Sequence, residues 1–176
     1  MNPMLPGGEA ATFDDPLAML SACHLRIRKQ LATLERLERH LPEHGHDDDA
    51  RAAARAILRY FDSAAVHHHE DEEASVLPRL VDRVPAAREL ADRLLREHGE
   101  LARRWRRLRP LLSGIAAAQR SVMPPRLVRE LAAAYDAHIG LEESELIPLA
   151  QEALSADEIA TIGREMARRR GVGAPA

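Results

Sequence analysis

The sequence predicts an all-α fold: an up-down-up-down four-helix bundle followed by a short fifth helix. Apolar residues recur every three or four positions along four long segments, which is the spacing of one helix face. Aromatic residues make up only 3% of the chain, so leucine, alanine, valine and isoleucine must form the core, a composition that favours helices over sheets. The connections between the long segments are short, which places neighbouring helices antiparallel.

The first helix is expected to begin after Asp15. An aspartate followed by a proline, here Pro16, is typical of an N-cap with proline at the first helical position. The apolar face continues to Leu41, and we expect Pro42 and Gly45 to end the helix.

The second and third helices are marked by an acidic run and by prolines. The aspartates 47–49 suit the start of the second helix, because negative charge there meets the positive end of the helix dipole. Pro78 lies near the expected end of that helix. The third helix is expected to begin around Pro85 and to bend or end at Pro110.

Prolines mark the fourth helix, and a capping box marks the fifth. The fourth is expected to start near residues 124–125, which are both proline, and to run until Pro148. Ser155 with Glu158 forms the pattern of a capping box, which predicts a short fifth helix through about Arg169.

The chain is expected to form one bundle domain with loose ends. We assign a flexible N-terminal arm to residues 1–13, the bundle to 14–153, the C-terminal helix to 154–170 and a tail to 171–176. No basic region precedes an apolar stretch at the N-terminus, and nowhere do about 18 apolar residues run without a charge. We therefore expect no signal peptide, no membrane span and a cytoplasmic location.

Composition excludes several functional classes and leaves one oddity. The net charge of −3 argues against general affinity for nucleic acids. Cys23 is the single cysteine, so the chain has neither a disulfide framework nor a thiolate metal cluster. The oddity is the presence of nine histidines in a chain with two phenylalanines.

Each of the four long helices carries a histidine on its apolar face. Burying unpaired imidazoles together costs on the order of several kcal/mol, and a metal ion shared by them is the simplest compensation. The four residues are His24, His68, His98 and His138.

Two of these histidines are followed, four residues later, by a glutamate on the same helix face: His68 by Glu72 and His138 by Glu142. Both stretches continue with a second glutamate, an apolar pair and a proline. The chain therefore consists of two helix hairpins that each supply His…His-x-x-x-Glu. Paired about a pseudo-twofold axis, they offer four imidazoles and two carboxylates.

This set suits two octahedral-preferring ions better than one tetrahedral ion. If both glutamates bridge, each ion receives two imidazoles and two carboxylate oxygens. Roughly two of six positions then stay open for a bridging oxo or hydroxo group and an exogenous ligand. Mixed imidazole and carboxylate ligation favours iron, manganese or zinc over copper(I) or calcium.

With these motifs the sequence resembles the haemerythrin-like family, the HHE cation-binding domain, over about residues 15–150. The resemblance rests on the two isolated histidines and on the two His-x-x-x-Glu-Glu motifs, and it implies a non-haem di-iron centre in a four-helix bundle. Oxygen-carrying haemerythrins have a further histidine where this chain has Ala102. Their last helix has an aspartate four residues after its histidine, whereas this chain has His138-x-x-x-Glu142. The pattern is closer to bacterial proteins associated with repair of damaged iron centres and with nitrosative stress. The ligands that the resemblance implies are His24, His68, His98 and His138, with Glu72 and Glu142 as bridges.

We therefore expect a di-iron protein with open metal positions for oxygen, nitric oxide or peroxide, serving in sensing, scavenging or iron handling. A redox enzyme that reduces peroxide or an N-oxide is one alternative, and a metal-stabilised interaction module is another. A binding protein is favoured over a dedicated enzyme. The chain is expected to be a monomer or a homodimer without nucleic-acid or membrane partners.

Residues 67–69 are three consecutive histidines, and the helix register decides which of them faces the core. His68 continues the apolar line of the second helix, and His69 is the second choice. Glu73 and Glu143 are expected to face solvent or to form hydrogen bonds behind the ligands.

Other polar residues are expected to have ordinary roles. Tyr135, one turn before His138, is interpreted as a tyrosine at the core edge rather than a residue at an open metal position. The histidines at 40, 44 and 46 are interpreted as parts of a solvated loop, and the arginines between 103 and 109 as a solvated helix face.

Overall fold

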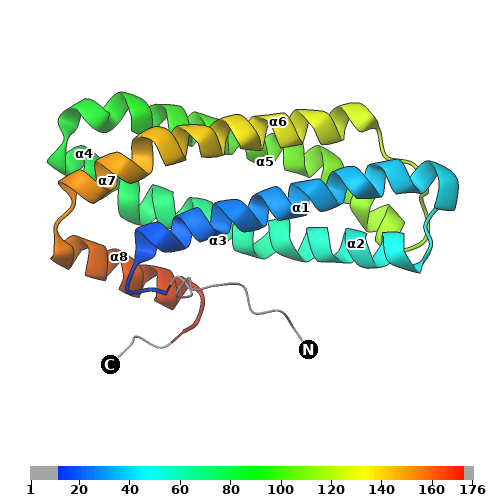
Figure 1. Cartoon of the computed structure of the whole chain (residues 1–176), viewed down its shortest axis with the longest axis horizontal. Coiled ribbons are helices and arrows are strands. Elements are labelled where there is room, and N and C mark those ends of the chain that lie inside the picture. Colours follow the sequence, from blue (N-terminus) through cyan, green and yellow to red (C-terminus); the bar gives the residue numbers. More distant parts are fainter. Residues whose placement is uncertain (1–11, 173–176) are drawn as a thin grey trace, which may run out of the picture.

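A computed structural model describes residues 12–172 of the chain, and all regular elements in that range are helical, without a strand (Figure 1). The all-α prediction is confirmed for these residues. The expected N-terminal arm and C-terminal tail lie outside the described residues, except for residues 12–13 and 171–172. No helix of the described part is both long and apolar enough to cross a membrane.

Two of the long segments are built from several helices. Three π-helical turns, Tyr60–Ala64, Glu72–Val76 and Glu142–Leu146, join helices without a break. They produce an α2–α4 segment over residues 48–83 and an α6–α7 segment over residues 125–153. The helices are α1 (Pro16–His44), α2 (Asp48–Arg59), α3 (Ala65–Asp71), α4 (Leu77–Arg83), α5 (Arg88–Ala116), α6 (Pro125–Leu141), α7 (Ile147–Ala153) and α8 (Ala156–Arg169).

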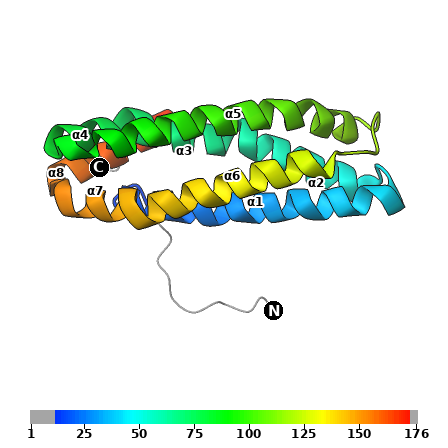
Figure 2. The same ribbon diagram turned by 90° about the horizontal axis from the view of Figure 1, so that it is seen from above.

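The long segments lie side by side along most of their length. Helix α1 packs against α2 and α6, and α5 packs against the same two helices (Figures 1 and 2). At the other end of the molecule, α4 packs against α5 and α7. The short helix α8 lies across α1 and α3.

The helix ends follow the capping rules. The Asp15 carboxylate accepts a hydrogen bond from the Ala18 amide at 3.0 Å, and the Asp47 carboxylate accepts one from the Ala50 amide at 2.8 Å. Gly45 ends α1 with a φ of 64°, in the left-handed region that favours glycine. The capping box of Ser155 and Glu158 is present at the start of α8.

The prolines stop fewer helices than expected. Helix α1 includes Pro42 and ends only at Gly45, and α5 continues through the exposed Pro110 to Ala116. Around Pro110 the apolar side of α5 stays fully buried, and this packing outweighs the roughly 3 kcal/mol cost of an interior proline. Pro78 and Pro148 are the second residues of α4 and α7, directly after π-helical turns, and the segments run on through them to residues 83 and 153.

The core consists of two apolar clusters at opposite ends of the molecule. In α1, Leu20 belongs to one cluster and Ile27 to the other, and in α5 the same is true of Leu94 and Leu101. Between them lie six buried polar residues, which we call the polar layer: His24, His68, Glu72, His98, His138 and Glu142.

Helix α8 is held next to the polar layer by buried charge. Asp71 of α3 has no exposed surface, and it accepts hydrogen bonds from Arg169 at 2.7 Å and from Arg170 at 2.6 Å. Arg169 also donates to the hydroxyl of Ser75 at 2.6 Å. A buried carboxylate is tolerated when it is paired in this way, so the C-terminal helix neutralises the residue beside Glu72.

A glycine allows the chain before α1 to cross α8. A Cβ atom on Gly163 would lie 1.9 Å from the carbonyl oxygen of Phe13. Gly163→Ala must therefore push these segments apart, and we expect it to lower the free energy of unfolding by about 1–3 kcal/mol in urea titrations.

Gly140→Ala is the matched control, because a Cβ at this exposed position of α6 meets no described atom within 4 Å beyond its own helix and chain neighbours. It should stabilise the protein by roughly 0.5–1 kcal/mol through helix propensity. An unchanged urea midpoint for Gly163→Ala would contradict the contact.

Candidate metal centre

The structure brings all six predicted site residues together in the polar layer. Their exposed fractions range from 0% to 4%. One histidine comes from α1, one from α3, one from α5 and one from α6, and the two glutamates follow α3 and α6 directly.

The two glutamates belong to both halves of the layer. Potential ligand atoms lie within 4.8 Å of one another in two overlapping groups that share Glu72 and Glu142. His24 and His68 complete one group, and we call it the first position. His98 and His138 complete the other, the second position.

At the first position, Nε2 of His24 lies 3.0 Å from a carboxylate oxygen of Glu142. Nε2 of His68 lies 3.4 Å from Glu72 and 3.9 Å from Glu142. Two donors that each bind a cation at about 2.0–2.2 Å and at right angles are separated by roughly 3 Å, so these spacings suit ligands of one ion.

The second position has matching spacings. Nε2 of His138 lies 2.9 Å from Glu142, and Nε2 of His98 lies 3.3 Å from Glu72 and 3.6 Å from Glu142. The pseudo-twofold arrangement inferred from the repeated motif is therefore present in the side chains.

The inward-facing atoms of the layer have no hydrogen-bond partner among the described residues. They are the Nε2 atoms of the four histidines and both carboxylate oxygens of each glutamate. Buried polar atoms are rarely left in this state, and each costs on the order of 1–3 kcal/mol. Imidazole nitrogens and carboxylate oxygens that converge in this way fit a divalent cation, so the residues present can hold the metal ions that the sequence predicts.

Three carboxylates orient the imidazoles from behind. Nδ1 of His98 donates to Glu73 at 2.7 Å, and Nδ1 of His138 donates to Glu97 at 2.9 Å. A carboxylate can only accept, so it holds a ring proton on Nδ1 and makes Nε2 the nitrogen that would ligate a cation.

Nδ1 of His24 is bound in the same way by Glu143, at 3.2 Å. Arg28 donates to the same carboxylate at 3.0 and 3.2 Å and holds it in place. Glu73 and Glu143 thus form hydrogen bonds behind the ligands, one of the two roles expected for them. Glu97 was not predicted.

Both glutamates of the layer begin a π-helical turn. Glu72 opens the turn Glu72–Val76, and Glu142 opens the turn Glu142–Leu146. Such turns insert one residue into a helix and occur frequently at functional sites. The two turns occupy the same place in the two repeats, which indicates that this local widening of the helix helps to position the glutamates of the site.

Burial and charge set the protonation of the two glutamates. Burial raises the pKa of Glu72 well above its ordinary value, and the facing Glu142 raises it further. Burial acts on Glu142 in the same direction, but the imidazoles outweigh it and hold the pKa of Glu142 well below its ordinary value. Those imidazoles are His138, His24 and His98.

The histidines are affected in opposite ways. Burial lowers the pKa of His68 to about 3, which keeps this imidazole in its neutral, ligating form. Burial also acts against the charged form of His98, but the surrounding carboxylates Glu142, Glu72 and Glu73 outweigh it and raise its pKa to about 11. A cation entering the layer must therefore displace a proton from His98.

Two neighbours of the layer are buried but lie outside the ligand groups. Tyr135 has 3% of its surface exposed and packs within the apolar cluster, 5.6 Å from the Phe61 ring between centroids, as expected for a core tyrosine. Cys23 is buried next to His24, and burial raises the pKa of its thiol.

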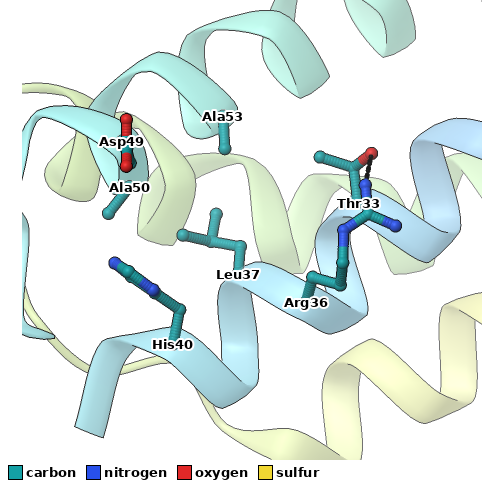
Figure 3. A pocket seen from close by; sticks show the side chains of 7 residues that line it. All are labelled: Thr33, Arg36, Leu37, His40, Asp49, Ala50 and Ala53. Carbon is teal, nitrogen blue, oxygen red and sulfur yellow. Dashed lines mark hydrogen bonds between the residues drawn. The ribbon is translucent and has the colours of Figure 1, made fainter. Parts of the chain in front are cut away.

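The histidines near the α1–α2 connection form no comparable cluster. Nε2 of His40 lies 2.9 Å from Asp47, and Nδ1 of His46 lies 2.6 Å from the Ser121 hydroxyl. His40 of α1 lines a cavity of about 340 Å³. In Figure 3 its ring points toward Asp49 and Ala50 of α2. No group of potential ligands in the described part of the chain includes these histidines.

The arginines of α5 pair with surface carboxylates. Arg104 and Arg107 lie 3.5 and 3.4 Å from Glu130, and Arg109 lies 3.0 Å from Asp62. Asp62 also accepts a hydrogen bond from the indole of Trp105 at 3.0 Å. These contacts agree with the predicted solvated face.

Comparison with known proteins agrees with this geometry. The profile of the Hemerythrin HHE cation binding domain matches residues 15–150, which include every residue of the polar layer. An uncharacterized protein of Haemophilus influenzae (strain Rd) is 35% identical to the chain over 162 residues, which cover 92% of this chain and 94% of that protein.

We expect the carboxylates behind the histidines to control metal affinity. Glu73→Gln keeps the size of the side chain but removes the negative charge that fixes the proton on Nδ1 of His98. The affinity for Zn²⁺, measured by competition with a chromophoric chelator, should fall about 10–100-fold.

Glu70→Gln is the matched control, since Glu70 is exposed in the same segment and belongs to no ligand group. Equal Zn²⁺ affinities for the two variants would show that Glu73 does not act through His98.

Proposed function

The chain belongs to the hemerythrin HHE cation-binding family, and from that premise we propose that its polar layer holds two iron ions with coordination positions open to a small ligand. Oxygen, nitric oxide and peroxide are the ligands of suitable size, and the protein serves in sensing, scavenging or iron handling during stress. The centre supplies reversible ligand binding and one-electron chemistry, while the chain supplies orientation, exclusion of water and control of protons.

The proposal of two ions rests on the two glutamates that both positions share. Glu72 and Glu142 each face histidines of both positions, at 2.9–3.9 Å between nitrogen and oxygen. No ligand group contains all six side chains, so one ion would not engage them all. Two ions would each be held by two histidines, with Glu72 and Glu142 available to both. This overlap of two ligand groups is the observation that carries the proposal.

The kind and number of the donors fit iron. Each position has two imidazole nitrogens and two carboxylate oxygens, a mixed set that suits iron, manganese or zinc better than calcium or copper(I). Four protein donors leave about two of the six positions of an octahedral ion free. A small ligand can bind at these free coordination positions.

The size limit on the ligand follows from burial. No residue of the polar layer exposes more than 4% of its surface, and apolar clusters cover both sides of it. A molecule of a few atoms can reach such a site through side-chain motion, whereas a metabolite cannot.

We also infer that the four long segments form an up-down-up-down four-helix bundle. The pairwise packing of α1, α2, α5 and α6 supports it, as does the short connection between α1 and α2 at residues 45–47. In this arrangement each segment contributes to the layer from its own side.

The two-ion proposal predicts different losses for different ligands. His24→Leu removes a donor from one position alone, so iron content after anaerobic reconstitution should fall from two per chain toward one. Glu142→Leu removes a donor from both positions, and the content should fall toward zero. His44→Leu, a change at an exposed histidine outside the ligand groups, is the control and should retain two.

Iron content is measured on desalted protein, and absorption of the aerobic samples reports oxo-bridge charge-transfer bands. A wild-type protein with clearly fewer than two irons and without such bands would overturn the proposal. The same loss in His24→Leu and Glu142→Leu would contradict the assignment of shared and unshared ligands.

A further inference from the structure

The internal repeat differs directly after the histidine of each motif, beside the polar layer. His68 is followed by His69, whereas its counterpart His138 is followed by Ile139. Ile139 is fully buried in the apolar cluster, which is the ordinary use of such a position. His69 therefore gives one half of the site an imidazole that the other half lacks.

His69 lies against the second position. Its ring stacks on the ring of His98, with centroids 4.1 Å apart and an angle of 14° between the planes, and it lies 5.8 Å from the ring of His138. The ligand nitrogens of these three residues lie within 4.8 Å of one another. Nε2 of His69 is buried and has no hydrogen-bond partner among the described residues.

We propose that His69 is a third imidazole ligand of the cation held by His98 and His138, an inference that rests on the proposed two-ion function. The second position then has five protein donors, because Glu72 and Glu142 complete the set. The first position keeps four. The two cations are therefore unequal, and the open coordination lies mainly beside His24 and His68.

The surroundings allow the small movement that this role requires. Two ligands of one ion converge through their nitrogen atoms, so His69 must turn out of its stack with His98 when a cation binds. It borders a cavity of about 150 Å³ that is also lined by Ala102 and Tyr135, and this space accommodates the turn. Ala102 lies one turn after His98 on α5, so its small side chain leaves room for the imidazole.

The proposal is tested first on the unaltered protein. Zn²⁺ serves as a diamagnetic probe, and nitrogen NMR of protein labelled in its histidines distinguishes metal-bound from free imidazole nitrogens. We expect five metal-bound imidazoles at two Zn²⁺ per chain. Four would overturn the proposal and leave His69 as a stacking partner of His98 only.

A variant series then identifies the residue. His69→Leu should weaken binding of one of the two Zn²⁺ ions about tenfold or more and leave the other unchanged. His67→Leu is the matched control, because His67 is in the same run and belongs to no ligand group. Adding Ala102→His to His69→Ala should restore the lost affinity by supplying an imidazole from α5.

The outcomes separate this inference from the proposed function. If His69→Leu binds two Zn²⁺ ions with wild-type affinities, His69 is not a ligand, although the two-ion centre stands. If wild type itself binds fewer than two, the proposed function fails. Far-ultraviolet circular dichroism of the metal-free variants confirms that each is folded, and recovery in the double variant excludes general damage as the cause.

Discussion

A buried layer of six polar side chains lies between two apolar clusters. Its burial without hydrogen-bond partners destabilises the fold, and the surrounding structure must compensate for this. The Nε2 atoms of four histidines and the oxygens of Glu72 and Glu142 face one another without hydrogen-bond partners among the described residues. Each unsatisfied atom destabilises a folded chain by on the order of 1–3 kcal/mol. A cation bound between these donors would convert the same atoms into a source of folding energy.

The adjacent glutamates of each motif connect the two hairpins. Glu72 and Glu73, from the first hairpin, face the two ring nitrogens of His98 in the second at 3.3 and 2.7 Å. In the reverse direction, the pair that begins at Glu142 faces both ring nitrogens of His24, at 3.0 and 3.2 Å. Each isolated histidine is therefore held by the opposite hairpin, so the metal centre and the packing of the two halves depend on each other.

The sequence predicted the polar layer because its residues break a strong pattern: histidine or glutamate replaces an apolar residue at helical spacing. Features that depend on contacts between helices gave no such signal. Glu97 lies in a strongly charged helix, and only the approach of α6 shows that it binds His138. The π-helical turn that begins at Glu142 requires a hydrogen-bond shift that composition does not report. Pro110 does not end α5, one of the two outcomes expected of it, because buried packing of α5 outweighs the local preference of proline.

Anomalous diffraction at the iron absorption edge, from crystals of the reconstituted protein, tests the central claim most directly. Two peaks about 3.5–4 Å apart are expected between Glu72 and Glu142, with the histidine Nε2 atoms on their outer sides. A single peak, or peaks only at exposed histidines such as His40 and His44, would contradict a two-ion centre in the buried layer.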